Sequence, residues 1–273
     1  MIFGNAAWGL RETPLEEQFK ITADMGLTEL ELGIANASDD VPLNVSEKDL
    51  DRIKELSSRC GVNISCAATG NDFTVGDADV DKVKRVIDIS HSLGVRYLRI
   101  FAGFTALEKV TDKSFAVMLR ALKDVCLYAG GKGVVPVIET HGGVNGYDDG
   151  VEHFMSTTTD LETIKRILAS LPENAMLCYD PANLYAVGVT MPETFYVELR
   201  SRIAYAHFKD FRSLPSGRLK PSHCGDSSMD WRAILTAMKD FSGICFFEYE
   251  NTEDIEEGLK RCSNYITERM TEL

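Results

Sequence analysis

Four ionisable residues in the second half of the 273-residue chain each follow a run of apolar residues. Successive members are 41, 27 and 41 residues apart, so each falls at the end of a different predicted strand. Three carboxylates that converge with an imidazole repel each other and are costly to bury, unless a cation lies among them. Mixed oxygen and nitrogen ligands suit one divalent metal ion, Mn²⁺, Co²⁺, Mg²⁺ or Zn²⁺, and the sequence does not choose among these. The four residues are Glu139 after VVPVI, Asp180 after AMLCY, His207 after IAYA and Glu248 after ICFF.

Each of these residues also has a purely structural interpretation. Taken alone, any one of them could be a polar strand-end residue at the boundary with water, or half of an ion pair with a lysine. The same arrangement at four strand ends in succession favours a shared metal site instead.

The elements that must position these residues alternate along the whole chain. Apolar runs of strand length recur at intervals of roughly 35 residues, and most are almost continuously apolar, as in parallel strands that are covered on both faces. The predicted strands begin near Ile2, Leu27, Val62, Val95, Val134, Ala175, Ile203 and Ile244.

The segments between the strands have helical periodicity and recognisable ends. Ser46-x-x-Asp49 and Thr159-x-x-Glu162 predict helix N-termini. Left-handed glycines are expected at the ends of three helices, at Gly26, Gly61 and Gly94.

Eight βα units without an intervening linker predict a single (β/α)8 TIM barrel over residues 1–273. The alternative fold is an open doubly wound sheet, which more often has a GxGxxG motif after its first strand, and this chain has none there.

Composition limits the class of partner. The chain has 29 Lys and Arg against 42 Asp and Glu, a net charge of −13, which argues against a nucleic-acid or anionic-membrane surface. No basic segment precedes an apolar run at the N-terminus, and no apolar stretch approaches the ~20 residues that a membrane helix needs. The seven cysteines are scattered without a CxxC motif, as expected for buried free thiols in a reducing cytoplasm.

The four strand ends carry a resemblance to a known family. The stretches PVIETHGG, YDPANL, AHFKD and CGDSSMDW, followed by FFEYE, resemble the xylose-isomerase-like sugar isomerase and epimerase superfamily. The resemblance implies that Glu139, Asp180, His207 and Glu248 bind the metal, with Glu250 as an alternative to Glu248. The family usually has a GEG-x-IDW stretch. At the matching positions this chain has Asp226 in place of the Glu and Ser227 in place of the second Gly.

The resemblance also implies substrate-binding positions. His141 matches a residue on the substrate side, with an ordinary loop histidine as the alternative. Asn183 matches an Asn or His that faces the substrate or a metal-bound water, and it could instead cap the helix that follows Asp180. Lys209 resembles a substrate-binding lysine, with Asp210 as its structural partner.

Two early strands add polar residues at the same barrel mouth. Arg99 could bind a substrate oxygen, or it could form a salt bridge with Glu31 or another barrel acid, which we favour. Trp8 could pack on a sugar face, although packing at the barrel rim is the simpler interpretation.

Two segments are longer than usual βα connections, residues His141–Thr158 and Phe211–Ser228. Both are predicted to be loops that leave the mouth of the barrel, where they could act as lids. The stretch Lys209–Lys220 is locally basic, which fits an anionic substrate group or, more simply, a solvated loop.

The implied function is sugar or polyol chemistry. The first hypothesis is an aldose–ketose isomerase or ketose epimerase, in which a divalent metal stabilises an enediolate while Glu139 and Glu248 remove and return a proton. The second is a keto-polyol dehydratase of the inosose type, which adds the loss of a β-hydroxyl group.

Two further hypotheses have weaker support. An endonuclease IV-like enzyme would need more metal-binding histidines than the five His present, and a basic DNA-binding face. A non-catalytic sugar-binding barrel would not need all four ligand positions to be filled. Dimers and tetramers are common in the family, and the sequence leaves a homo-oligomer open.

Overall fold

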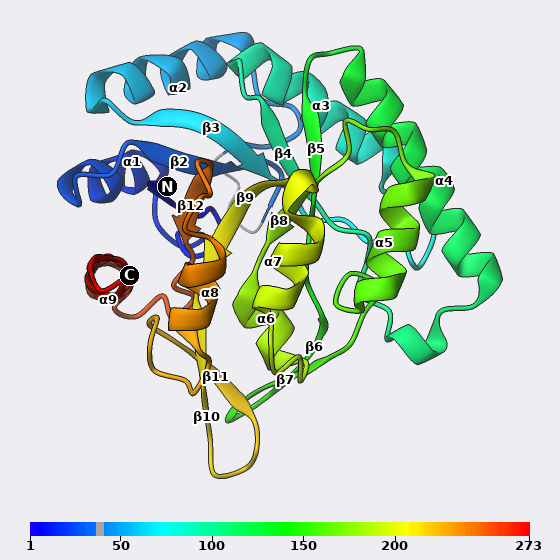
Figure 1. Cartoon of the computed structure of the whole chain (residues 1–273). Coiled ribbons are helices and arrows are strands. Elements are labelled where there is room, and N and C mark those ends of the chain that lie inside the picture. Colours follow the sequence, from blue (N-terminus) through cyan, green and yellow to red (C-terminus); the bar gives the residue numbers. More distant parts are fainter. Residues whose placement is uncertain (37–40) are drawn as a thin grey trace.

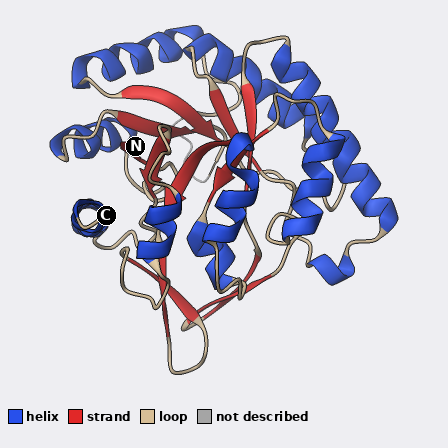
Figure 2. Cartoon of the chain, viewed as in Figure 1, coloured by secondary structure: helices blue, strands red, loops and turns tan. Residues whose placement is uncertain are grey.

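The computed structural model describes residues 1–36 and 41–273. Eight parallel strands close into a barrel in the order β1-β12-β9-β8-β5-β4-β3-β2, with helices around it (Figures 1 and 2). The predicted (β/α)8 fold is therefore confirmed. The barrel strands are β1 (Ile2–Asn5), β2 (Glu29–Gly33), β3 (Asn63–Ala68), β4 (Tyr97–Ile100), β5 (Val135–Glu139), β8 (Met176–Tyr179), β9 (Ile203–Phe208) and β12 (Ile244–Phe247).

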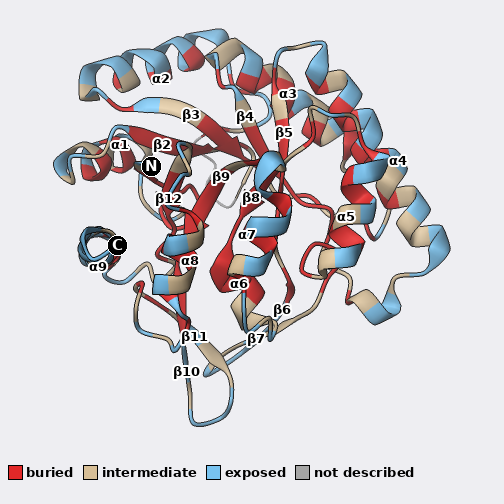
Figure 3. Ribbon diagram, in the orientation of Figure 1, coloured by how far each residue is buried: buried red, intermediate tan, exposed pale blue. Residues whose placement is uncertain are grey.

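Every barrel strand begins within two residues of its predicted start. The apolar runs predict the strands well because both faces of the barrel wall are buried (Figure 3). One core lies between the wall and the helices. A smaller apolar cluster fills the barrel interior, and it consists of Ala6, Cys66, Val137, Cys178, Tyr205 and Phe246.

The helices pack on the outer face of the wall (Figure 2). No helix in the described part of the chain is long and apolar enough to cross a membrane. The helices are α1 (Leu15–Asp24), α2 (Glu47–Cys60), α3 (Val80–Leu93), α4 (Asp112–Gly130), α5 (Leu161–Ser170), α6 (Pro181–Ala186), α7 (Glu193–Leu199), α8 (Trp231–Ala237) and α9 (Ile255–Thr271), with 3-10 turns η1 (Leu107–Lys109) and η2 (Arg200–Arg202).

Most of the predicted helix ends are observed. The Ser46 hydroxyl accepts a hydrogen bond from the Asp49 backbone N–H at 3.2 Å and so begins α2. All three predicted glycines are left-handed, with φ of 71° at Gly26, 66° at Gly61 and 76° at Gly94.

The predicted start of α5 is wrong by one residue. Asp160, rather than Thr159, caps this helix, because the Asp160 carboxylate accepts from the Thr163 backbone N–H at 2.9 Å. The Thr159 hydroxyl instead accepts from the Ser156 backbone N–H at 2.9 Å and so closes the preceding turn.

The two long connections are not irregular loops, and this part of the prediction is wrong. They form a second, four-stranded sheet in the order β10-β11-β7-β6, which extends from the barrel at the bottom of Figure 1. Leu219 on β11 pairs with Val151 on β7 and so joins the two connections. The strands are β6 (Gly143–Tyr147), β7 (Gly150–Phe154), β10 (Asp210–Ser213) and β11 (Leu219–Ser222).

The glycines of the first connection suggested a loop, but at least one of them is required for packing. A Cβ atom on Gly143 would lie 2.0 Å from the Phe154 ring and 2.6 Å from the Phe104 carbonyl oxygen. Glycine at this position therefore allows the β6–β7 hairpin to approach the barrel mouth closely.

Candidate metal and substrate site

The four predicted ligand residues lie at the carboxyl ends of four adjacent barrel strands. Glu139 is the last residue of β5, Asp180 follows β8, His207 is near the end of β9 and Glu248 follows β12. Because parallel strands end at the same rim of a barrel, their side chains meet there. All four residues are buried.

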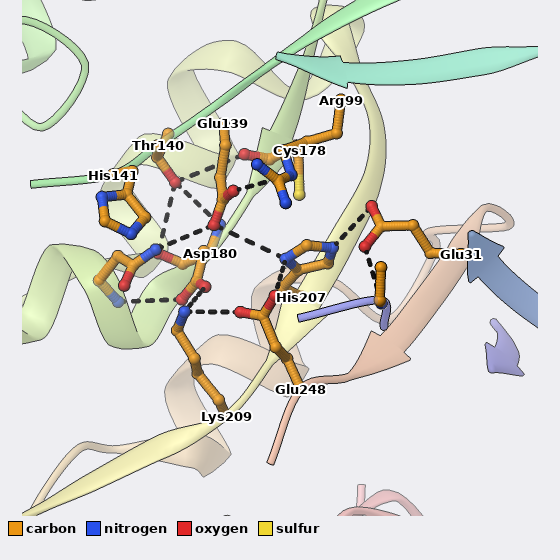
Figure 4. A network of polar contacts seen from close by, with 12 residues as sticks. Glu31, Arg99, Glu139, Thr140, His141, Cys178, Asp180, His207, Lys209 and Glu248 are labelled. Atoms are coloured by element: carbon orange, nitrogen blue, oxygen red, sulfur yellow. Dashed lines mark hydrogen bonds and ion pairs between the residues drawn. The ribbon is translucent and has the colours of Figure 1, made fainter. Parts of the chain in front are cut away.

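These side chains converge closely (Figure 4). One potential ligand atom from each of Glu139, Asp180, His207 and Glu248 lies within 4.8 Å of the others. His207 Nδ1 is 3.3 Å from Glu248 Oε1 and 3.6 Å from Glu139 Oε1. Metal–ligand bonds of roughly 2.0–2.6 Å would fit inside such a group.

The bonding of these atoms fits a cation. His207 Nδ1 is buried and has no hydrogen-bond partner among the described residues. Asp180 Oδ2 also lacks a hydrogen bond among the described residues, and the Lys209 ammonium lies 3.2 Å from it. Buried polar atoms normally have a hydrogen-bond partner. These two atoms have none, and a divalent ion bound between them would supply the missing interaction.

Asp180 and Asn183 are held by the start of α6. The Asp180 carboxylate accepts from the Asn183 backbone N–H at 2.9 Å, so Asp180 is the N-cap of this helix and Asn183 is not. The Asn183 side chain donates to Glu139 Oε1 at 3.0 Å. Asn183 therefore orients a candidate metal ligand, and direct contact between Asn183 and the substrate stays a prediction.

Lys209 is buried among carboxylates. Its ammonium donates to Glu248 Oε2 at 2.6 Å and to Glu250 Oε1 at 2.7 Å. Burial opposes the charged form, but the carboxylates of Asp180, Glu248 and Glu250 raise the pKa of Lys209 well above its usual range. Lys209 is therefore a protonated group at the floor of the site.

The predicted pairing of Lys209 with Asp210 is wrong. Adjacent residues of an extended chain point to opposite sides, so Asp210 faces away from the site. The Asp210 carboxylate accepts instead from the Trp231 indole N–H at 3.0 Å and from the Gly225 backbone N–H at 2.9 Å.

Arg99 forms the salt bridge that the sequence favoured. Its Nε lies 3.3 Å from Glu139 Oε2, and both side chains are buried. The same guanidinium lies 4.3 Å from the centre of the Phe101 ring and lines the cavity above the site. The alternative, in which Arg99 contacts a substrate oxygen, therefore stays a prediction beside the observed ion pair.

A cavity of about 640 Å³ adjoins this group, and of the four candidate ligands Glu139 and Glu248 line it. Glu139, Glu248, Glu250 and Lys209 lie on its polar side, and Trp8, Phe101 and Phe104 contribute aromatic wall. A polar floor under apolar walls is the usual form of a small-molecule site.

His141 reaches this cavity between two aromatic rings. The ring centres of Phe101 and Phe104 lie 5.2 and 5.3 Å from the centre of its imidazole, both in edge-on contact. Burial lowers the pKa of His141, so the ring is neutral at pH 7. Its Nδ1 contacts the Gly142 carbonyl oxygen, which can only accept, so Nε2 is left as a hydrogen-bond acceptor.

The protonation states of the candidate ligands differ because their neighbours differ. Burial raises the pKa of Glu139, but Arg99 and His207 outweigh this effect and lower it to about 2. Burial similarly opposes ionisation of Glu248, yet Lys209 and His207 hold its pKa well below the usual range. Both glutamates are therefore ionised at neutral pH.

The sequence missed several residues of the cavity. His153 on β7 lines it and packs against Phe211 at a ring-centre distance of 4.8 Å, and burial lowers the pKa of His153 to about 3. The sequence did not indicate His153 as a cavity residue, because the β6–β7 hairpin that carries it was predicted to be a loop. Phe101 and Phe104 could have been found, because they directly follow the strand end that carries Arg99.

Solved structures with the same fold are similar over almost the entire chain. A probable 3-DHS dehydratase, AsbF, from Bacillus anthracis is 14% identical with a TM-score of 0.78, and 98% of this chain and 99% of that one are covered. A D-allulose 3-epimerase from Methylomonas sp. is 16% identical with a TM-score of 0.76, covering 98% of each chain. The IolI protein with a bound zinc atom is 17% identical with a TM-score of 0.77, covering 100% of this chain and 99% of that one.

A search of curated proteins finds no similar sequence. At the family level, residues 19–265 match a family described as xylose isomerase-like TIM barrel, which covers most of the chain. The match spans all four candidate ligands and the cavity residues except Trp8 and Arg11. The chain therefore belongs to the xylose isomerase-like TIM barrel family.

Proposed function

We propose that the chain is a divalent-metal-dependent enzyme that isomerises or epimerises a keto sugar by moving a proton next to the carbonyl group. The observation that carries this proposal is the pair of buried, ionised carboxylates, Glu139 and Glu248, which both line the cavity and both contact His207 Nδ1. Two proton acceptors at one centre are what removal and return of a proton require.

The residues have distinct roles in this proposal. Glu139, Asp180, His207 and Glu248 hold the metal, which when bound supplies Lewis-acid stabilisation of the negative charge that develops on the substrate oxygens. One of the two glutamates removes the proton, and the other returns it to the opposite face or to the neighbouring carbon. Arg99 keeps Glu139 ionised, and Lys209 does the same for Glu248.

The relatives support this class of reaction. Among the structures with this fold are a D-allulose 3-epimerase solved with D-allulose, an L-ribulose 3-epimerase and the zinc-binding IolI protein. We transfer from them the class of substrate, a small sugar or polyol, and the use of a divalent ion.

A dehydratase is the second candidate function. Loss of a β-hydroxyl group needs a proton donor beside the leaving oxygen. The Lys209 ammonium is protonated and lines the cavity, so it could supply that proton. The similar fold of the probable 3-DHS dehydratase AsbF is compatible with this alternative.

The experiment that separates the two functions is a substrate screen in D₂O followed by NMR. Ketoses, inososes and keto acids are incubated with the protein and Mn²⁺, Co²⁺ or Mg²⁺. Deuterium incorporation without loss of water indicates an isomerase or epimerase, whereas an unsaturated product indicates a dehydratase. A protein that binds the metal but exchanges no proton in any substrate would contradict both.

Glu139→Gln tests the catalytic assignment. We expect kcat to fall by roughly 10²–10⁴-fold, because the amide cannot accept the proton, while the far-UV circular dichroism spectrum stays unchanged. Glu162→Gln makes the same chemical change at a side chain that is 82% exposed, and it should retain full activity. Wild-type turnover by Glu139→Gln would refute the assignment.

We also propose a cytoplasmic location. All seven cysteines are free, and six of them are buried, so the fold contains no disulfide that an oxidising compartment would supply. Thiol titration of protein purified from cytoplasm and from periplasm, under denaturing conditions, would test this, with seven free thiols expected from the cytoplasm.

A further inference from the structure

Glu31 is a buried carboxylate next to the candidate metal site that the proposed reaction does not use. It lies on β2 and is fully buried. Its Oε1 accepts hydrogen bonds from the Tyr205 hydroxyl at 2.9 Å and from His207 Nε2 at 3.2 Å. Its Oε2 accepts from the Ala7 backbone N–H at 3.2 Å. Glu31 therefore contacts the nitrogen of His207 that faces away from Glu139 and Glu248 (Figure 4).

These contacts fix the proton on one side of the imidazole. The Tyr205 hydroxyl and the Ala7 backbone N–H both donate to the Glu31 carboxylate, so Glu31 acts as an acceptor and His207 Nε2 carries the proton of their shared hydrogen bond. The other nitrogen, Nδ1, is then the atom left to offer a lone pair to a metal ion, and it lies 3.3 Å from Glu248 Oε1 and 3.6 Å from Glu139 Oε1. Histidines that bind metals are commonly oriented by a carboxylate on the second nitrogen in this way.

We propose that Glu31 is a positioning residue, which sets the tautomer and orientation of His207 so that Nδ1 presents its lone pair to the metal. This inference rests on the proposed metal site, but it does not depend on which reaction the metal serves. The proposed role belongs to the side chain of Glu31. Among the described residues, His207 is the only ion-pair partner that Glu31 has.

The backbone pairing is irregular next to Glu31. The register of the β2–β3 pair shifts between Leu30 and Glu31, where Ser65 of β3 is the extra residue between the partners Ile64 and Cys66. Such irregularities re-aim side chains next to functional sites. The shift lies next to Glu31, whose side chain contacts Tyr205 of β9.

The energetic cost of this arrangement also argues for a role. Removing an ionised carboxylate from water is expensive unless it is paired. The buried guanidinium of Arg99 forms its ion pair with Glu139, and the hydrogen bonds to Glu31 come from Tyr205, Ala7 and the His207 imidazole. An apolar residue at position 31 would avoid the cost if the contact with His207 had no purpose.

The test compares metal binding by three variants of the full chain. Isothermal titration calorimetry with Mn²⁺ is run on the wild type, Glu31→Gln, Tyr205→Phe and the matched control Glu29→Gln. Glu29 is a buried glutamate two residues earlier on the same strand, but its side chain bonds Asn63 and Ser65 instead of the site. In Glu31→Gln one carboxylate oxygen becomes an NH₂ group. If this group faces His207, two donors meet and the hydrogen bond is lost; if it faces the Ala7 N–H, that hydrogen bond is lost and His207 keeps only a neutral amide oxygen as its acceptor.

The expected result is a loss of metal affinity of about 10–100-fold in Glu31→Gln, less than threefold in Tyr205→Phe and none in Glu29→Gln. Each variant must keep the wild-type circular dichroism spectrum. Equal affinity of Glu31→Gln and wild type would overturn this proposal and leave the metal site standing. Absence of Mn²⁺ binding by the wild type would overturn both.

A second measurement does not depend on metal affinity. In protein labelled with ¹⁵N-histidine and loaded with Zn²⁺, His207 should carry a slowly exchanging proton on Nε2, assigned by comparison with His207→Gln. A proton on Nδ1, or metal bound through Nε2, would refute the assigned orientation even if Glu31→Gln lowers the affinity for a structural reason.

Discussion

The pKa of Asp180 is raised, whereas the pKa values of Glu139 and Glu248 in the same site are lowered. Burial raises the pKa of Asp180, Lys209 lowers it, and the nearby Glu139 and Glu248 raise it again, so that it lies at about 7. Glu139 in the same group has a pKa of about 2, because Arg99 is its direct partner. Two carboxylates a few ångströms apart therefore hold their protons over different pH ranges.

This difference predicts how metal binding depends on pH. The pKa of Asp180 in the folded, metal-free protein lies above its ordinary value of 3.8. Between about pH 4 and pH 7 the folded state therefore keeps a proton that the unfolded chain has lost. The contribution of Asp180 to the free energy of unfolding falls as the pH rises through this range. A bound cation must displace that proton. The rise in melting temperature on adding Mn²⁺ should thus be larger at pH 8 than at pH 5.5.

Differential scanning fluorimetry with and without Mn²⁺ at the two pH values checks this prediction. Glu162→Gln, which alters only an exposed carboxylate, should follow the wild type. A stabilisation by Mn²⁺ that is equal or greater at pH 5.5 would contradict the involvement of Asp180.

The residues that could be predicted from the sequence are those at the ends of apolar runs. Glu139, Asp180, His207 and Glu248 were found because the end of a barrel strand is readable as the point where the apolar run stops. The carboxylate partners of Lys209 could not be predicted in the same way, because Asp180 and Glu248 lie at the ends of other strands, 29 and 39 residues away in sequence.

At the scale of elements, the barrel wall was predictable and the second sheet was not. A strand that is buried on both faces is marked by its own residues. The strands β6, β7, β10 and β11 are short, partly exposed and rich in glycine or charged residues, so their pairing depends on contacts between distant segments. The two predicted loops instead form a sheet that contributes Val144, Val151 and Pro221 to the cavity wall, and a lid role for these segments stays a prediction.

Asp210 connects this second sheet to the loop before α8. Its Oδ2 accepts hydrogen bonds from Gly225, Ser227 and Trp231, at 2.9 to 3.4 Å, while Oδ1 accepts from the Phe211 N–H at 2.9 Å. These contacts give the CGDSSMDW stretch a structural role in holding the loop against β10.

Asp210→Asn should therefore destabilise the protein. One amide group cannot accept all four hydrogen bonds, so at least one buried donor loses its partner, at a cost of about 1–3 kcal/mol. Urea denaturation monitored by tryptophan fluorescence measures this free energy of unfolding. Asp226→Asn, an exposed aspartate in the same loop, is the control and should change it by less than about 0.5 kcal/mol. Equal stability of the two variants would show that Asp210 does not anchor the loop.

On the scale of the whole molecule, the family match over residues 19–265 and the closed barrel agree with the eight-unit pattern of the sequence. The acidic charge of the chain divides into two parts. Part of it surrounds the candidate metal site, where Arg99, Lys209 and the proposed cation offset it. Among the other described acids, Glu29 and Asp210 are buried and the rest are at least partly exposed.

We propose that residues 1–273 unfold as one domain, because the barrel closes only when β1 pairs with β12, near the two ends of the chain. Differential scanning calorimetry should show a single transition with a calorimetric enthalpy equal to the van't Hoff enthalpy. Two resolved transitions would indicate separate folding units.

The most direct test of the account is anomalous X-ray diffraction from crystals soaked in Mn²⁺. We predict a single strong anomalous peak in contact with Glu139, Asp180, Glu248 and Nδ1 of His207. No peak, or a peak bound elsewhere while this group stays empty, would contradict the central claim that these four strand ends hold one divalent cation.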